Sequence, residues 1–259
     1  GVLINALSYI AVIGSLMAMR VKPWCALRTN VHPLRTLKDG LDYAFGSAPI
    51  RATLIQLTLS SLFGMGLSVL VPVFAKDILR GDADTMGILL SATGVGALLG
   101  TAYLATRKSM AAMGKMIAGG IILHGIMTIA FGVSEILWLS LILIAFSGFG
   151  EMMQRVSSNT LLQTIVDDDK RGRVMSLYAM SVMGTMPLGG LLAGTMAEHI
   201  GAPRTLIILG ICCALNGLYF VSRLTMLTPL LHTLFVKRGV IREKVAAVAA
   251  STVVQDGVD

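Results

Sequence analysis

The stretch Ala52-Thr-Leu-Ile-Gln-Leu-Thr-Leu-Ser-Ser-Leu-Phe-Gly-Met-Gly-Leu-Ser-Val-Leu-Val-Pro-Val-Phe74 contains no charged residue. A helix needs about 20 mostly apolar residues to cross the hydrocarbon core of a bilayer, and this stretch is long enough. Hydrophobic residues make up 55% of the whole chain and charged residues 14%, and the mean hydropathy is +0.79. Average soluble domains carry roughly 25% charged residues, so the sequence predicts a membrane protein built from helices.

Further apolar blocks of similar length lie on either side of this stretch and together predict seven membrane-spanning helices. The fifth is longer than the hydrocarbon thickness at about 1.5 Å per residue, so we expect it to tilt or to project into water. The predicted spans are residues 2–19, 52–74, 85–106, 116–133, 136–166, 174–197 and 205–221.

Lys and Arg are concentrated in alternate connections between these blocks. They are frequent in residues 20–51, after the third and fifth blocks, and in the C-terminal tail, whereas the other connections contain few or are offset by acids. Connections rich in positive charge are cytoplasmic, so we expect the tail to lie in the cytoplasm. This topology accounts for the formal charge of +7 and makes nucleic-acid binding unnecessary.

The first apolar block lacks the basic start and the small-residue cleavage site of a signal peptide, and the chain begins at Gly1. We therefore expect residues 1–19 to be the last helix of an N-terminal half that is missing from this sequence. Residues 20–51 form a basic cytoplasmic connector, residues 52–223 a complete six-helix unit, and residues 224–259 a cytoplasmic tail.

An amphipathic helix is predicted within the connector. Leu34, Leu37, Leu41 and Phe45 recur at helical spacing with charged residues between them. The helix lies either on the inner membrane surface or against the cytoplasmic loops.

A charge cluster follows the fifth block and is predicted to form a cytoplasmic turn between the fifth and sixth spans. Gly172 would let the chain turn tightly there. The cluster consists of Asp167, Asp168, Asp169, Arg171 and Arg173.

Several short passages resemble, in order and spacing, the branch of the major facilitator superfamily that contains bacterial siderophore (enterobactin) exporters. The resemblance covers residues 1 to about 223, and the tail matches no passage of that branch. The passages are residues 5–12 (Asn-Ala-Leu-Ser-Tyr-Ile-Ala-Val), 61–66 (Ser-Leu-Phe-Gly-Met-Gly), 71–77 (Val-Pro-Val-Phe-Ala-Lys-Asp), 94–100 (Gly-Val-Gly-Ala-Leu-Leu-Gly) and 171–178 (Arg-Gly-Arg-Val-Met-Ser-Leu-Tyr).

The resemblance implies an all-α fold: the six-helix C-terminal half of a twelve-helix bundle, preceded by one further transmembrane helix. It implies proton-driven antiport that exports a small amphiphilic molecule, siderophore or drug-like, across a bacterial inner membrane. The expected partners are the lipid bilayer, this substrate, and either the missing N-terminal half or a second copy. In such transporters, cytoplasmic charges of this kind latch the outward-facing state, so the charge cluster would be a cytoplasmic gate. An ordinary stop signal at the helix ends is the alternative.

Glu151 and Arg155 are the strongest candidates for coupling. Glu151 lies about 22 Å down the fifth span from its outer end, where charged residues are costly and face the bundle interior or a water-filled cavity. The i,i+4 spacing places Arg155 on the same helix face. Either Glu151 carries a proton that is coupled to substrate movement, or the two residues form a structural ion pair near the inner interface.

Other polar residues within the spans either line a cavity or form hydrogen bonds between helices. His124 is either a packed structural histidine or a proton relay. The remaining candidates are Gln56, Asn159, Gln163 and Asn216.

Glycine and proline residues predict helix packing and bending. Gly96 with Gly100, and Gly190 with Gly194, have the small-xxx-small spacing that lets helices approach closely. Pro187, with Gly189 and Gly190, predicts a bendable sixth span. The surrounding run Gly-Thr-Met-Pro-Leu-Gly-Gly (184–190) resembles the glycine-proline motif of exporters but has Met in place of the glycine before proline.

Enzyme signatures are absent from the sequence. It contains no HExxH, P-loop lysine or GxSxG motif, and the three cysteines lack metal or redox spacing. We therefore predict no enzyme, no cofactor and no metal. A lipid or lysolipid flippase is the competing transport function, and a non-transporting scaffold or decayed fragment is the alternative from another class.

Overall fold

The computed structural model describes residues 9–10, 12–15, 17–18, 33–107 and 112–237. The chain divides into residues 1–35 and 36–259, and the architecture given below is that of the second unit. Most of the first predicted span, residues 2–19, and the tail beyond residue 237 lie outside the described residues.

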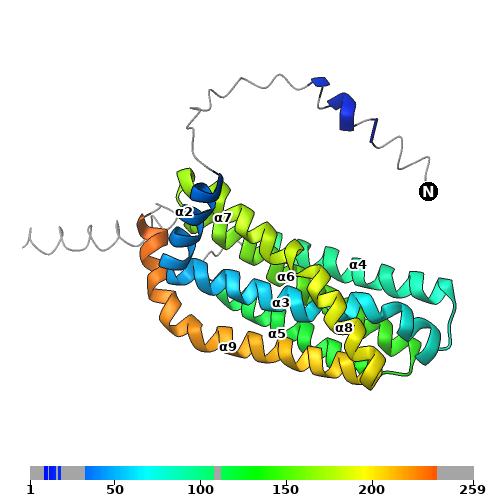
Figure 1. Cartoon of the computed structure of the whole chain (residues 1–259). Helices are drawn as coiled ribbons and strands as arrows, with labels where there is room; N and C mark the ends of the chain where they lie inside the picture. The colour runs from blue at the N-terminus through cyan, green and yellow to red at the C-terminus, as the bar shows by residue number, and fades with distance from the viewer. Residues whose placement is uncertain (1–8, 11, 16, 19–32, 108–111, 238–259) are drawn as a thin grey trace, which may run out of the picture. The chain divides into compact units, whose positions relative to one another are not determined.

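Six helices are long and apolar enough to cross a membrane, and the described residues contain no strand (Figure 1). The prediction of an all-helical membrane protein with a six-helix unit is confirmed. The candidate spans are Ala48–Ile78, Ala83–Ala105, Met113–Gly132, Leu137–Ile165, Asp168–Ile200 and Ala202–Leu224.

Two of these spans contain a short π-helical segment, so the helix labels are more numerous than the spans. The helices are α2 (Pro33–Gly46), α3 (Ala48–Val73), η1 (Phe74–Ile78), α4 (Ala83–Ala105), α5 (Met113–Gly132), α6 (Leu137–Ile165), α7 (Asp168–Ala179), η3 (Met180–Gly184), α8 (Met186–Ile200) and α9 (Ala202–Lys237).

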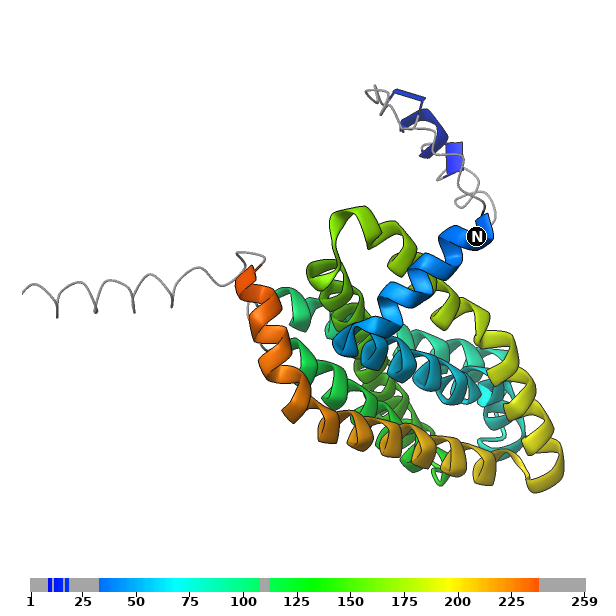
Figure 2. The same cartoon turned by 60° about the vertical axis from the view of Figure 1, so that its left-hand side comes forward.

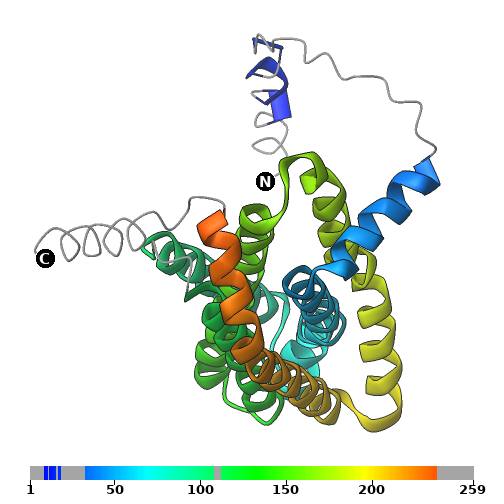
Figure 3. The same cartoon turned by 90° about the vertical axis from the view of Figure 1, so that its left-hand side faces the viewer.

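The spans pack in the order α4, α6, α5, α9, α3, α8. In Figure 3, α8 lies at one side of the bundle and α5 and α6 at the other. Helices α4 and α7–α8, at the two ends of this order, are the least buried spans. Helix α3 packs mainly against α9 and α8 and touches α6 little, which leaves room between α3 and α6.

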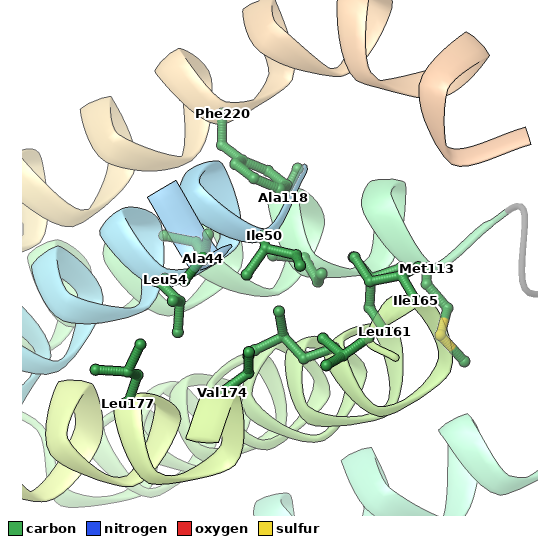
Figure 4. Packing of buried hydrophobic residues seen from close by; sticks show 14 residues of the cluster. Ala44, Ile50, Leu54, Met113, Ala118, Leu161, Ile165, Val174, Leu177 and Phe220 are labelled. Carbon is green, nitrogen blue, oxygen red and sulfur yellow. The ribbon is translucent and has the colours of Figure 1, made fainter. Parts of the chain in front are cut away.

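The core has an apolar cluster at each end of the bundle. At the α2 end, Ile50 of α3 packs with residues of α5, α6, α7 and α9 (Figure 4). At the opposite end, the rings of Phe74 and Phe131 lie with their centroids 4.8 Å apart, beside the buried Leu206. Between membrane-spanning helices, such side chains stabilise the bundle mainly through close van der Waals packing, because lipid tails are as apolar as the side chains themselves. The buried polar side chains of the spans lie mainly between the two clusters.

Glycines allow the closest helix crossings. A Cβ added to Gly100 of α4 would come 2.6 Å from the Phe149 carbonyl oxygen of α6, and Gly120 of α5 and Gly150 of α6 face each other equally closely. The predicted packing role of Gly96 and Gly100 is confirmed. The prediction for Gly190 with Gly194 is wrong, because Gly194 has open space around it and Gly190 meets only a methyl group of Val69.

Helix α2 confirms the helix predicted in the connector. Ala44 is fully buried in the cluster of Figure 4, and Leu41 packs against that cluster. Figures 1 and 2 show α2 beside the first turns of α7. The helix therefore packs on the ends of the spans.

The charge cluster was predicted to be a turn, and this is wrong for most of its length. The chain turns at Val166 and Asp167, and Asp168 already begins α7. Gly172 lies within α7 and makes no turn. The cluster forms a helix rather than a turn because its acidic residues lie in the first turn of α7, where they interact favourably with the helix dipole.

Candidate functional site

A polar cavity of about 80 Å³ lies between α3, α5, α6 and the start of α8. Its volume is enough for several water molecules. Its depth places it between the two apolar clusters, near the middle of the spans. The lining residues are Ser60, Ser61, Gly64, Met65 and Ser68 of α3, Ile121 and His124 of α5, Glu151, Gln154 and Arg155 of α6, and Met186 of α8.

Glu151 and Arg155 form an ion pair in this cavity. Arg155 Nη2 donates to Glu151 Oε1 over 2.6 Å, so the pairing expected from the i,i+4 spacing is present. Glu151 lies at the midpoint of α6, about 21 Å from each end. The Glu151 side chain is 33% exposed and that of Arg155 26%. The pair therefore faces open space rather than a sealed interior, and a ligand or a proton can reach it.

Tyr178 of α7 joins the same region from the side. Its hydroxyl donates to the backbone carbonyl of Arg155 over 3.3 Å. This bond links α7 to the turn of α6 that carries the arginine. A movement of α7 would consequently displace the backbone of Arg155 and, with it, the ion pair.

His124 approaches the cavity from α5 and is oriented by α6. Its Nδ1 lies 2.9 Å from Ser147 Oγ and 3.2 Å from the Ser147 carbonyl oxygen. Nδ1 donates to Ser147 in one tautomer and accepts from the Ser147 hydroxyl in the other, and Nε2 takes the opposite role. Nε2 is buried without a hydrogen-bond partner among the described residues. A Cβ at Gly64 would lie 3.1 Å from it, so this glycine leaves the imidazole room.

Gln56 lies behind the cavity wall, hydrogen-bonded to a residue that lines it. Gln56 Nε2 and Asn216 Nδ2 both donate to Ser60 Oγ over 3.1 Å, and Asn216 also donates to the Gln56 backbone carbonyl over 3.1 Å. Gln56 is 2% exposed and Asn216 6%. The network joins α3 to α9 and fixes the orientation of the Ser60 hydroxyl.

Asn159 is not brought to the cavity. Gln163 Nε2 donates to Asn159 Oδ1 over 2.8 Å on an exposed face of α6. Among the predicted coupling residues, the structure therefore groups Glu151, Arg155 and His124 at the cavity, with Gln56 behind its wall.

Residues of the charge cluster contact helix α2 and one another. Tyr43 of α2 donates to Asp167 Oδ2 over 2.9 Å, and the Asp167 amide donates to the Tyr43 hydroxyl over 3.2 Å. Arg173 lies 3.6 Å from Asp39 of α2. Arg171 pairs with Asp168, and Lys170 with Asp169. The connector helix is therefore attached to the start of α7 by two side-chain links.

The sixth span is interrupted just before Pro187. The π-helical segment η3 ends at Gly184, and Pro187 lies in the first turn of α8. Proline lacks an amide hydrogen and its ring crowds the carbonyl four residues earlier, which favours a locally widened helix. Gly189 then packs on the backbone of α3 at Leu62, whereas Gly190 does not.

Sequence reasoning missed the serine wall of the cavity. Ser60, Gly64 and Ser68 follow one another at i, i+4 and i+8 and so share one face of α3. This stripe of small residues, two of them serines, was the sequence signal that could have indicated the cavity wall. Gln154 was also missed; it lies on α6 between the two members of the ion pair.

The MFS_3 family model, described as transmembrane secretion effector, matches residues 2–231. The chain belongs to this family. The MFS_3 assignment confirms the resemblance to the major facilitator superfamily, a family of membrane transporters and not of enzymes.

Individual relatives of this MFS_3 chain are distant. It is 28% identical over 189 residues to the staphyloferrin A transporter of Staphylococcus aureus, which covers 72% of the chain and 47% of that protein. It is 28% identical over 186 residues to the multidrug efflux pump Tap of Mycolicibacterium fortuitum, covering 71% and 45%. An uncharacterised MFS-type transporter of Bacillus subtilis, YfmI, is 22% identical over 202 residues, covering 76% and 50%. The chain spans about half the length of these relatives.

Proposed function

We propose that the chain is the C-terminal half of a bacterial inner-membrane exporter that carries a small amphiphilic molecule, with transport coupled to protonation of Glu151. The observation that carries this proposal is the Glu151–Arg155 ion pair, which faces a polar cavity midway along the spans. Ionisable groups at this depth are costly and mark substrate or proton pathways. The relative named as a multidrug efflux pump supports export, and the relative named as a staphyloferrin A transporter supports a small-molecule substrate.

A second half would complete the central cavity. The chain matches only about half of each relative's length. Transporters of this kind bind substrate between two repeats that rock about a midplane site. We therefore expect an N-terminal half, or a second copy of this chain, to form the opposite wall.

The proposed orientation places the C-terminal end of α9 in the cytoplasm. Arg107 follows the end of α4 and stacks over Tyr103, and Arg223, at the end of the membrane-spanning part of α9, stacks over Tyr219. Trp138, at the opposite end of the bundle, is 76% exposed. Aromatic residues favour both interfaces, and arginine favours the cytoplasmic one.

The charge cluster would act as a gate through the connector helix. Tyr43 and Asp39 attach α2 to Asp167 and Arg173 at the start of α7. Because α2 follows the N-terminal part of the chain, a displacement of the N-terminal half would move α2 and, through these contacts, α7. Pro187 and the π-helical segment before it give α7 a place to bend.

A lipid or lysolipid flippase is the second candidate function. An apolar groove of about 310 Å³ lies between α2, α3 and the α7–η3 region, lined by residues such as Phe45, Ile55 and Met180. A laterally open groove of this kind suits an acyl chain. The polar cavity and the relatives' names favour the exporter.

The test measures proton movement in energised inverted vesicles on addition of a catecholate siderophore or a lipophilic cation. Three proteins are compared: the chain alone, the chain joined to the six-helix half expected upstream, and the joined form with Glu151→Gln. Glu198→Gln is the matched control, because Glu198 is exposed outside the cavity. We expect proton movement in the joined wild type and the control only. A well-inserted joined form that is silent with every substrate would refute the proposal and favour a flippase or scaffold.

A further inference from the structure

His124 of α5 has one ring nitrogen in contact with α6 and the other without a partner. The side chain is 6% exposed and lines the polar cavity. Nδ1 contacts Ser147, whereas Nε2 is buried and makes no hydrogen bond to any residue that the structure describes. A buried polar atom without a partner costs free energy. A group that enters the cavity and bonds to Nε2 would therefore be stabilised there.

Ser147 favours the tautomer in which Nε2 is an acceptor. Nδ1 lies 2.9 Å from Ser147 Oγ and 3.2 Å from the Ser147 carbonyl oxygen, so a hydrogen on Nδ1 has two acceptors to point at. Without that hydrogen, the lone pair of Nδ1 would face the carbonyl oxygen, and the two would repel each other. With the hydrogen on Nδ1, Nε2 has a free lone pair.

Gln154 of α6 presents the complementary group in the same cavity. It is 5% exposed, and its Nε2, a donor, is also buried without a partner among the described residues. Two unpaired acceptors, Gln56 Oε1 and Asn216 Oδ1, lie behind the cavity wall. The lining thus offers one buried acceptor and one buried donor that no described residue uses. A hydroxyl group matches both, because it can donate and accept.

The charge of the cavity also favours a neutral ligand. Glu151 and Arg155 neutralise each other, so any charged group that enters is left unbalanced at mid-membrane depth, which is costly. An ammonium group would add positive charge beside the guanidinium, and a carboxylate has no hydrogen to donate to the histidine. The apolar lining residues Met65, Ile121 and Met186 suit the hydrocarbon part of a ligand.

We propose that His124 Nε2 accepts a hydrogen bond from a hydroxyl group of the transported molecule, so that the substrate is a neutral, hydroxyl-bearing amphiphile. This inference rests on the proposed function, because it takes the cavity to be the substrate site. Gln154 Nε2 donates to an oxygen of the same molecule. Gly64 of α3 keeps the approach to the histidine open, because a Cβ there would lie 3.1 Å from Nε2.

A proton and the hydroxyl group exclude each other at this nitrogen. The protonated imidazole carries a hydrogen on both nitrogens and cannot accept a hydrogen bond. The neutral histidine therefore holds the substrate and the protonated histidine releases it, as an exchange of substrate for proton requires. The titratable groups on the surrounding helices are Glu151 and Arg155 of α6, Tyr178 of α7, and Cys212 and Cys213 of α9.

The experiment is ¹⁵N NMR on the chain in lipid nanodiscs with its histidines labelled, because the ring-nitrogen shifts report the tautomer, protonation and hydrogen bonding. The variant His124→Phe assigns the His124 signals by their loss. The probes are benzyl alcohol, benzyl methyl ether and benzylammonium. We expect benzyl alcohol to move the Nε2 signal of neutral His124 and the other two to leave it unchanged. The ether is the stricter control because it is more apolar than the alcohol and lacks only the hydroxyl hydrogen.

Two glycine variants test the geometry while keeping the histidine signal. Gly64→Ala places a methyl group 3.1 Å from Nε2 and should raise the half-saturating concentration of benzyl alcohol about tenfold or more. Gly194→Ala is the matched control, because Gly194 has open space around it, and it should respond as the wild type does. Lowering the pH should abolish the response wherever the spectrum shows both nitrogens of His124 protonated.

Three results would overturn the inference: a spectrum without probe in which Nε2 of neutral His124 carries the hydrogen, an Nε2 signal that benzyl alcohol moves no more than the ether or benzylammonium does, or a response that persists in the protonated form. The proposed function fails separately. Proton-coupled transport by the joined form, with a His124 signal that does not respond to benzyl alcohol, removes the inference and leaves the function standing. A specific response in a joined form that is silent in the transport assay keeps the binding site and refutes the transport.

Discussion

Gly120→Ala should destabilise the protein markedly, whereas Gly119→Ala, one residue earlier, should not. A Cβ at Gly120 would lie 2.6 Å from the Gly150 carbonyl oxygen and 2.8 Å from the Gln154 amide nitrogen. Ordinary van der Waals contact begins at 3.4 Å, so α5 and α6 would have to separate by about 0.8 Å there. The obstructing atoms are backbone, which cannot rotate away. At Gly119 the nearest atom is Met153 Cε, 3.9 Å away.

Two effects oppose each other in these variants. Replacing glycine by alanine in a helix gains about 1 kcal/mol in helix propensity, and this gain is common to both positions. Overpacking costs about 1–3 kcal/mol and applies at Gly120 alone. The difference between the two variants should therefore be about 1–3 kcal/mol, with Gly119→Ala neutral or slightly stabilised.

The assay is thermal unfolding in detergent micelles, followed by circular dichroism. For a domain of this size each kcal/mol corresponds to roughly 2–4 °C in Tm. Because Gln154 lines the cavity and Gly150 adjoins Glu151, Gly120→Ala should also disturb the ion pair. Equal Tm values for the two alanine variants would show that the α5–α6 crossing is not limited by backbone contact, and the reasoning would fail.

Three smaller predictions concern the helix ends. Tyr43→Phe removes the hydroxyl that contacts Asp167 and should lower the stability of this contact region by about 1 kcal/mol. The loss should appear as faster amide hydrogen exchange in the first turn of α7. Unchanged exchange would contradict the link between α2 and α7. Asp82 caps α4 by accepting from the amides of Asp84 and Thr85, the latter bond being the main cause of the lowered pKa of Asp82. The cap therefore stabilises α4 at pH values above the unfolded-state pKa of Asp82, and this stability is lost as the pH falls through the folded-state pKa. In the Asp82→Ala variant the amide hydrogens of Asp84 and Thr85 should exchange quickly at every pH. Exchange rates of these amides that do not depend on pH in the wild type would contradict this. Arg80 has φ of +52°, so Arg80→Gly should raise stability by about 1 kcal/mol, seen as a higher Tm.

The spans could be predicted from sequence because their signal is simple. Length and hydropathy alone located the six helices, since a bilayer requires about 20 apolar residues whatever their packing partners. The Glu151–Arg155 pair also followed from spacing within one helix. Both inferences use only local chain geometry.

Features that depend on how helices rotate against one another could not be predicted. The carbonyl that orients His124 comes from Ser147 of another helix, and the partner of Asp167 is Tyr43, far away in sequence. The small residues at 190 and 194 matched a packing pattern, but neither lies at a close helix crossing: Gly190 meets only a Val69 methyl group and Gly194 has open space around it. A helix sequence reports which residues share a face, and not which neighbour that face will meet.

The π-helical segment within the sixth span shifts the phase of that helix. Leu177 and Gly189 both face α3, although they are 12 residues apart (189 minus 177). In an uninterrupted α-helix, at about 100° per residue, they would point about 120° apart. The residue inserted by a π-turn absorbs about 100° of this, bringing the two onto nearly the same face. A single-residue deletion within residues 180–184, ordinarily disruptive in a membrane helix, would keep both seams in register, while Pro187 would then kink an otherwise uninterrupted helix.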